Sequence, residues 1–148
     1  MLLWLFVINL GIAFGAGLYE AGIVVPLWGS SPPESLRSPD SGRRFWAFVT
    51  TVPLTLLTLG NLVAGLATHG PRRGWLLAAV VLVMIERTLT FSYFIPTMLR
   101  LQRSTTLGAP AIKAKLSQWT RLNYVRNALT LAAWVAALRA LSLPRGPT

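Results

Sequence analysis

Four charged side chains lie within otherwise apolar stretches of this sequence, and they are the residues best suited to chemistry: Glu20, Glu86, Arg87 and Arg126. We call them the charged quartet and predict them as catalytic groups. A carboxylate in apolar surroundings can act as a general base toward a weakly acidic carbon or phenol. A nearby guanidinium can stabilise the enolate or phenolate that forms. Because the two acids and two bases balance, the alternative is that they only tie the helices together.

Polar residues recur at helical spacing around these charges. Intervals of three and four residues place side chains on one helix face. The clearest such face, in the third apolar stretch, holds Glu86, Thr90, Tyr93, Thr97 and Arg100. Similar faces hold Asn9, Ala13, Ala16 and Glu20 in the first stretch, Thr51, Thr55 and Thr58 in the second, and Trp119, Asn123, Arg126 and Thr130 in the fourth. From these faces we predict the substrate-binding residues Tyr93, Asn123, Thr90, Thr51 and Trp119.

The elements that must position these residues are four apolar segments. Hydrophobic residues make up 53% of the chain and charged residues 12%, whereas a soluble domain has about 25% charged residues. The segments cover about residues 2–26, 45–68, 75–101 and 117–143, and about 20 apolar residues are enough for a helix to cross a bilayer. The sequence therefore predicts an all-α integral membrane four-helix bundle, with one transmembrane domain over residues 1–148.

Small residues and prolines predict local features of these helices. Gly11, Gly15 and Gly22 share one face of the first segment, which predicts close contact with another helix of the same chain rather than a dedicated dimer motif. Pro53 is expected to bend the second helix. Pro96 is expected to free a backbone carbonyl one turn earlier in the third helix, a common arrangement near membrane sites.

Several classes of site have no support in the sequence. There is no cysteine and only one histidine, His69, at a helix end by the membrane surface, so we expect neither a metal site nor a haem. Flavin fingerprints and glycine-rich phosphate loops are also missing, and we expect no cofactor. The net charge is +10, but the basic residues flank the apolar segments instead of forming one patch. They predict contact with a lipid bilayer rather than with nucleic acid.

The distribution of basic residues also predicts a topology. The first and third loops with their flanks hold eight lysines and arginines, and the opposite side holds four. By the positive-inside rule, these loops are cytoplasmic and both termini lie outside, in a bacterial inner (plasma) membrane. At about 1.5 Å of rise per residue, Glu86 lies near mid-membrane, and Glu20, Asn123 and Arg126 lie roughly one to two turns toward the cytoplasm.

Short motifs along the chain resemble a known family. They are GAGLYE at 15–20 leading to PLW at 26–28, TLTF at 88–91 leading to IPTML at 95–99, and WTRLNYVR at 119–126. In order these motifs are similar to those of the anthrone-oxygenase-like family of small four-helix membrane proteins. The resemblance implies the same fold and, as for some members, conversion of anthrones to anthraquinones without an obvious cofactor. The chain differs from the family pattern at Met98, where Asn is common, and at Asn123, where His is common.

The charge pattern and the resemblance together predict a pocket in the cytoplasmic half of the membrane that binds a lipophilic aromatic compound. In this hypothesis either glutamate of the quartet removes a proton. The two arginines, with Tyr93 and Asn123, then hold the anion for reaction with oxygen, as in a cofactor-independent oxygenase. The alternatives are a non-enzymatic membrane carrier using the same charges as a proton or anion site, and an accessory or structural subunit. The identity of the substrate and the association into homo-oligomers are left open.

Overall fold

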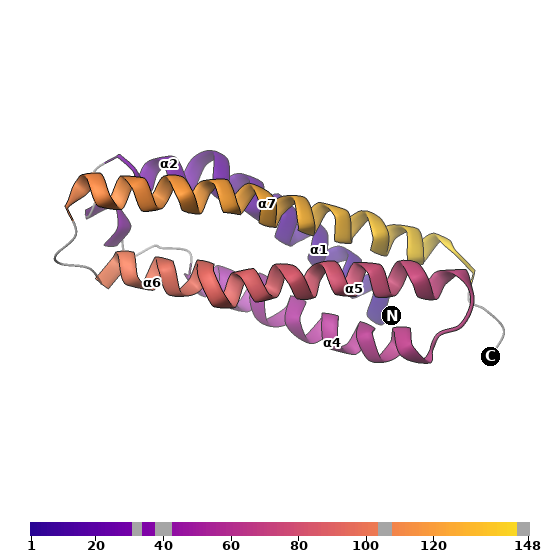
Figure 1. Cartoon of the computed structure of the whole chain (residues 1–148). Coiled ribbons are helices and arrows are strands. Elements are labelled where there is room, and N and C mark those ends of the chain that lie inside the picture. The colour runs from indigo at the N-terminus through magenta and orange to yellow at the C-terminus, as the bar shows by residue number, and fades with distance from the viewer. Residues whose placement is uncertain (31–33, 38–42, 104–107, 145–148) are drawn as a thin grey trace.

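The computed structural model describes residues 1–30, 34–37, 43–103 and 108–144, which form helices and turns but no strand (Figure 1). The first long helix joins α1 (Leu2–Tyr19), the π-helical segment η1 (Glu20–Val24) and α2 (Val25–Trp28). The second joins α3 (Arg43–Phe45), the π-helical segment η3 (Trp46–Thr51) and α4 (Val52–Ala67). The third joins α5 (Pro71–Leu89), the π-helical segment η4 (Thr90–Phe94) and α6 (Ile95–Arg103). The fourth is α7 (Ala109–Ser142), and a 3-10 turn, η2 (Glu34–Arg37), lies in the first loop.

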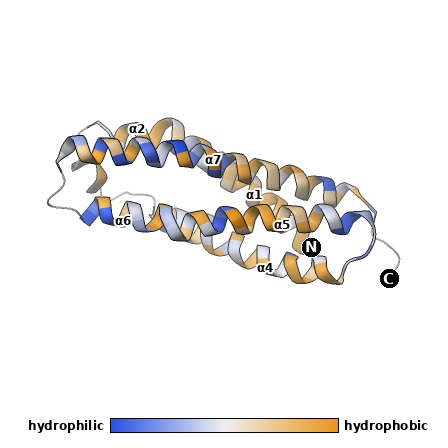
Figure 2. Cartoon of the chain, viewed as in Figure 1, coloured by the Kyte–Doolittle hydropathy of each residue, from blue (hydrophilic) through white to orange (hydrophobic). Residues whose placement is uncertain are grey.

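All four expected helices are present, so the all-α class is confirmed. The third begins at Pro71 instead of residue 75 and the fourth at Ala109 instead of residue 117, because a proline in the first helical turn is compatible with a helix start. Three segments are long and apolar enough to span a membrane: Leu2–Trp28, Trp46–Ala67 and Pro71–Arg103. The 34-residue α7 is not among them, and Figure 2 shows many hydrophilic positions in its first half.

The helix α7 lies along both α1 and α5, and α4 lies against α1 and α5 (Figure 1). Alanines of α7 allow this close approach, since Ala133, Ala136, Ala137 and Ala140 are all buried. The outer faces of the other helices carry large exposed apolar side chains, including Phe48, Leu56, Val63, Val81 and Ile85. These outer faces are compatible with contact to lipid. On α7 the polar residues Asn123, Arg126, Asn127 and Thr130 are buried against the neighbouring helices.

Two apolar clusters form the core. The first apolar cluster lies toward the N-terminal end of α1 and includes Leu3, Phe6, Leu10, Leu54 and Val83. The second apolar cluster lies toward the first and third loops and includes Trp28, Leu36, Phe94, Leu101, Ile112 and Trp119. The buried side chains of each cluster pack against one another, so both ends of the bundle have an apolar interior. The charged quartet lies between the two clusters.

The close approach of α1 to α7 is made at Gly11 and Gly17, so only one member of the predicted glycine face takes part. Gly11 does contact a tryptophan ring of α7, but Gly15 and Gly22 are exposed, with nothing within 4 Å of an added Cβ. The prediction is therefore wrong for these two. An added Cβ at Gly17 would collide with the side-chain oxygen of Asn127. The buried face of α1 is defined mainly by its bulky apolar residues. Gly17 lies on this face, whereas Gly15 and Gly22 do not,.

Each of the first three helices contains a π-helical segment that ends two residues before a proline: Pro26, Pro53 or Pro96. Proline has no backbone N–H, and its ring clashes with the carbonyl four residues earlier. A wider turn relieves this clash. For Pro53 that carbonyl belongs to Val49, and Asn9 Nδ2 donates to it at 3.0 Å. The expected distortion at Pro53 thus takes the form of a π-helical turn whose freed carbonyl is satisfied by a neighbouring helix.

Candidate ligand-binding site

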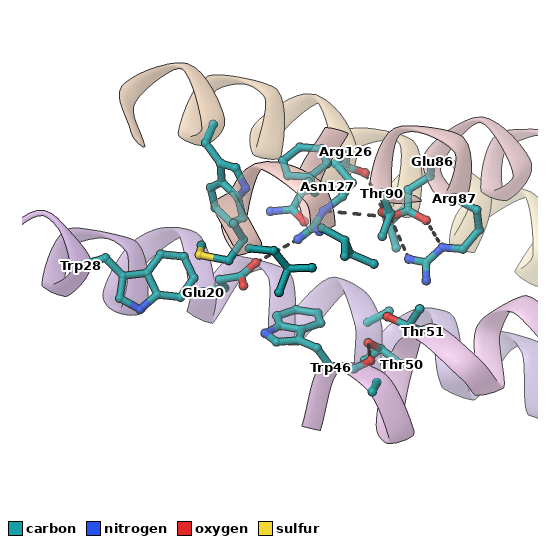
Figure 3. A pocket seen from close by; sticks show the side chains of 18 residues that line it. Glu20, Trp28, Trp46, Thr50, Thr51, Glu86, Arg87, Thr90, Arg126 and Asn127 are labelled. Atoms are coloured by element: carbon teal, nitrogen blue, oxygen red, sulfur yellow. Dashed lines mark hydrogen bonds and ion pairs between the residues drawn. The ribbon is translucent and has the colours of Figure 1, made fainter. Parts of the chain in front are cut away.

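The three π-helical segments meet around one cavity of about 270 Å³. Its walls are mostly apolar and aromatic, with the charged quartet and several threonines among them (Figure 3). The π-helical segments contribute Glu20 from η1, Trp46, Ala47, Thr50 and Thr51 from η3, and Thr90 and Phe94 from η4. A π-turn changes which side chains of a helix point inward, and such turns are frequent at functional sites. The backbone irregularities of three helices therefore coincide with the level of the buried charges.

Glu86 is the most heavily engaged acid of the quartet. Its neighbour Arg87 folds back and donates from Nε to Oε2 at 2.5 Å and from Nη2 to Oε1 at 2.8 Å. Thr90 Oγ1 also donates to Oε1, at 2.9 Å. The side chain of Glu86 is only 2% exposed. A bidentate pair of guanidinium and carboxylate is among the strongest charged hydrogen-bonding arrangements in proteins, so the side chains of Glu86 and Arg87 hold each other in place.

Glu20 is paired across two helices. Arg126 Nη2 donates to Glu20 Oε2 at 2.9 Å, the one hydrogen bond that Glu20 receives from the described residues. Arg126 Nε also lies 4.0 Å from Glu86 Oε1, so a single guanidinium lies between two carboxylates (Figure 3). Two acids and two arginines neutralise one another, which lowers the cost of keeping all four buried. The second oxygen of Glu20 keeps its capacity to accept a proton.

Aromatic rings surround Arg126. Its Cζ lies 4.7 Å from the ring centroid of Phe94, 5.6 Å from that of Trp46 and 6.0 Å from that of Trp119. Trp28 packs edge-on against Trp119, with centroids 5.6 Å apart. Each cation–π contact contributes about 0.5–2 kcal/mol. The rings therefore restrain the guanidinium and also give the cavity flat apolar walls.

Three residues of the cavity wall carry buried nitrogen donors that find no partner within the described ranges: Arg87 Nη1, Trp119 Nε1 and Asn127 Nδ2. A buried donor left without a partner costs about 1–3 kcal/mol, and most buried polar groups in proteins are paired. All three groups are donors. The wall is therefore suited to a ligand that presents acceptor oxygens.

Seven of the nine residues predicted from the sequence as site residues line this cavity. They are the charged quartet together with Thr51, Thr90 and Trp119. All four long helices contribute to the set, so residues far apart in the sequence meet at one place. The geometry brings these residues together, and their catalytic and binding roles stay predictions.

Tyr93 and Asn123 lie outside the cavity wall. Tyr93 packs edge-on against Phe94, with ring centroids 5.4 Å apart. The π-turn of η4 accounts for this, because it widens the helix and brings Phe94 rather than Tyr93 to the inner face,. Asn123 is wholly buried on α7, and its amide atoms have no hydrogen-bond partner in the part of the chain that the structure describes. Neither is among the residues that line this cavity, and their roles in binding stay predictions.

Sequence reasoning missed Trp28, Trp46, Phe94 and Asn127, all of which line the cavity. One signal could have found three of them, namely the prolines that follow the polar residues at similar depth in three helices. Each proline marks a distorted turn, and the aromatic side chains lie in or close to these turns. Asn127 gave a weaker signal as the direct neighbour of Arg126.

The acids available in the cavity are Glu20 and Glu86, and each is already paired with an arginine. Over the described ranges, no group of three or more His, Cys, Asp or Glu side chains is placed to hold a metal ion. The chemistry of the site therefore follows from its paired charges, its unpartnered donors and its aromatic walls. Comparison with family models, curated proteins and solved structures gave no match for this chain.

Proposed function

We propose that this chain is an integral membrane protein that binds a lipophilic aromatic compound with a weakly acidic proton, and that Glu20 accepts this proton. The observation that carries the proposal is a carboxylate bonded through one oxygen to a shared arginine, inside an aromatic-walled cavity. The exposed apolar faces of three membrane-length helices support a position in the bilayer. A lipophilic compound dissolved in the bilayer would be close to the site.

The cavity suits a small, flat ligand. Its volume of about 270 Å³ is close to the lower limit for ligand pockets, about 300–1,000 Å³. The rings of Phe94, Trp46 and Trp119 offer surfaces on which an aromatic ligand can pack, and aromatic pairs contribute about 0.5–1.5 kcal/mol beyond the area they bury. A compact polycyclic aromatic ketone or phenol fits these walls and supplies oxygens for the unpartnered donors.

Glu20 is better placed than Glu86 to take up a proton. Glu86 accepts hydrogen bonds from both Arg87 and Thr90, whereas Glu20 accepts one, from Arg126. Hydrogen bonds to a carboxylate favour its charged form. Transfer of a proton from the ligand to Glu20 would leave a ligand anion beside Arg126, whose positive charge remains to stabilise it.

Arg87 and Asn127 are the residues that we assign to the ligand oxygen. Each has a nitrogen donor without a partner among the described residues, and each lines the cavity. Donors fixed before the reaction stabilise an enolate oxygen most effectively where water is excluded. In this scheme Glu86 is a positioning residue, because its two hydrogen bonds from Arg87 hold that guanidinium at the cavity wall.

For an anthrone-like ligand, the resemblance of the sequence motifs supports oxygenation as the reaction. Removal of a proton from the methylene carbon gives an enolate, and molecular oxygen is the oxidant. The methylene carbon loses two hydrogens and gains one oxygen atom as a new carbonyl, while the second oxygen atom leaves as water. The residues of this chain remove the first proton and hold the anion while oxygen reacts.

Turnover of anthrone by the protein in lipid nanodiscs tests the proposal. We expect anthraquinone formation with matching oxygen uptake, and a rate lower by at least about 100-fold for Glu20→Gln, since a general base contributes about 10²–10⁴-fold. Tyr19→Phe is the matched control, because Tyr19 adjoins Glu20 but is 60% exposed on the outer face. Equal rates for Glu20→Gln and the unaltered protein would exclude Glu20 as the base. Binding of anthrone without turnover would instead support the carrier alternative.

We also propose that the first and third loops face the cytoplasm of a bacterial cell and that the chain lies in the inner membrane. Exposed basic residues gather where α6 ends and α7 begins: Arg100, Arg103, Lys113, Lys115 and Arg121 (Figure 2). Basic residues close to the ends of spanning helices favour the cytoplasmic side. The cavity, which is on the same side of the first apolar cluster as these residues, would then lie in the cytoplasmic half of the membrane.

A further inference from the structure

A second concavity, a groove of about 510 Å³, lies on the outer surface between α4 and the third long helix. Its rim includes Leu59, Met84 and Phe91, which are 52%, 45% and 51% exposed. All three belong to segments that are long and apolar enough to span a membrane. In a bilayer this rim would face the lipid.

The hydroxyl groups of the groove already have partners. Thr55, Thr58, Thr88 and Ser92 each donate to the carbonyl four residues earlier in the same helix, at 2.6–2.9 Å. A hydroxyl satisfied in this way does not require a polar ligand. Apart from Arg87, the groove therefore offers lipophilic molecules a surface of methyl groups, an aromatic ring and a thioether.

Arg87 lines both the groove and the cavity. Its guanidinium is directed at Glu86 (Figure 3), and its side chain is 12% exposed. Along the bundle axis the cavity is bounded by the first apolar cluster on one side and by the second on the other. The side chain of Arg87 is thus part of the wall of both the lipid-facing groove and the cavity.

We infer that the groove is the entry site for the lipophilic ligand of the cavity and that Arg87 is the gate between them. The inference rests on the proposed function, because it requires a ligand for the cavity. The gate opens when Arg87 transiently leaves Glu86 for the oxygen of an arriving ligand. It closes when the guanidinium returns to Glu86, where its Nη1, which has no partner among the described residues, can donate to the bound ligand. Glu86 keeps the hydrogen bond from Thr90 and has Arg126 Nε at 4.0 Å, so it retains two polar neighbours while the gate is open.

A reversible plug in the groove tests this inference. The chain has no cysteine, so Thr88→Cys creates a single thiol in the groove, to which benzyl methanethiosulfonate adds a bulky group that a reductant removes. Leu56→Cys is the matched control, because Leu56 lies on the outer face of α4 at 63% exposure and does not line the groove. The probe is 9,10-anthraquinone in lipid vesicles, and its binding is followed by quenching of tryptophan fluorescence.

We expect the benzyl label at position 88 to slow association and dissociation of the probe by the same factor, at least about 10-fold, with an unchanged dissociation constant. The reductant should restore both rates, and the labelled control should bind like the unlabelled control. Unchanged rates in labelled Thr88→Cys, or a weaker equilibrium affinity without slower association, would overturn the entry role while the proposed function stands. If neither the unaltered protein nor the control binds the probe, the proposed function fails and the inference fails with it.

Discussion

Removing the guanidinium of Arg126 should destabilise the bundle strongly. Arg126→Met leaves Glu20, which is 5% exposed, without the one donor it has among the described residues. Loss of one partner from a buried ion pair costs about 3–5 kcal/mol, mostly because the remaining charge is uncompensated. Methionine still packs against the surrounding rings but gives up the cation–π contacts, worth about 0.5–2 kcal/mol. We therefore expect the free energy of unfolding to fall by at least about 3 kcal/mol.

A double-mutant cycle separates pairing from packing. Glu20→Gln keeps an amide oxygen that can accept from Arg126, so we expect it to cost about 1–2 kcal/mol. The double variant removes both charges and should be more stable than Arg126→Met alone, so the coupling energy should exceed the cost of Glu20→Gln, about 1–2 kcal/mol. A neutral hydrogen bond between membrane helices averages about 0.6 kcal/mol, so a coupling of this size identifies an ionised pair.

Unfolding by a denaturing detergent in mixed micelles, followed by circular dichroism, measures these energies. Arg139→Met is the matched control, since Arg139 is exposed on the same helix, and surface substitutions usually change stability by no more than about 0.5 kcal/mol. If the two single substitutions are additive within about 0.5 kcal/mol, or if Arg126→Met costs no more than the control, Glu20 and Arg126 do not act as a pair.

Three further predictions follow from features outside the quartet. Asn9→Ala should lower the free energy of unfolding by about 1–3 kcal/mol, because the carbonyl of Val49 loses its donor,. A change below about 0.5 kcal/mol in the same detergent titration would contradict this. Gly17→Ala should lower the free energy of unfolding by about 1–3 kcal/mol, because the added methyl group overpacks the contact with Asn127,. Gly15→Ala, whose methyl group meets open space, should be neutral or slightly stabilising,. Equal unfolding midpoints for the two variants would refute the close approach at Gly17. Lys113→Cys should react with a membrane-impermeant maleimide only after spheroplasts are permeabilised, and labelling of intact spheroplasts would reverse the proposed topology.

Two features of the sequence allowed most of the correct predictions: the length of the apolar segments and the balance of the charges within them. Long apolar runs define helices regardless of the detail of their packing, so the number and order of the helices could be read directly. The meeting of Glu20 with Arg126 could also be anticipated, because an isolated charge is costly inside a bilayer and the two lie at similar depth in different segments. The bidentate contact of Arg87 with its own neighbour Glu86 could not, since neighbouring positions on a helix point about 100° apart.

The placement of Tyr93 differs from the prediction because the prediction assumed a constant helical period. A fixed period places Tyr93 on the face of Glu86 and Thr90, whereas the π-turn brings Phe94 there instead. Asn123 shares the nominal face of Arg126 but is wholly buried and is not one of the residues that line the cavity. Spacing alone cannot locate a π-turn, although a proline two residues later accompanies each of the three described here.

The π-turns also explain why there is empty volume inside this bundle. Each extra residue rotates the rest of its helix by about 100° relative to a regular α-helix. Three helices undergo this change of phase at one level, so the apolar pattern on one side of the bundle does not continue into the pattern on the other. The two apolar clusters are therefore packed as separate units, and the cavity lies between them. The backbone distortions create the cavity. The side chains that line it then determine which ligand it accepts.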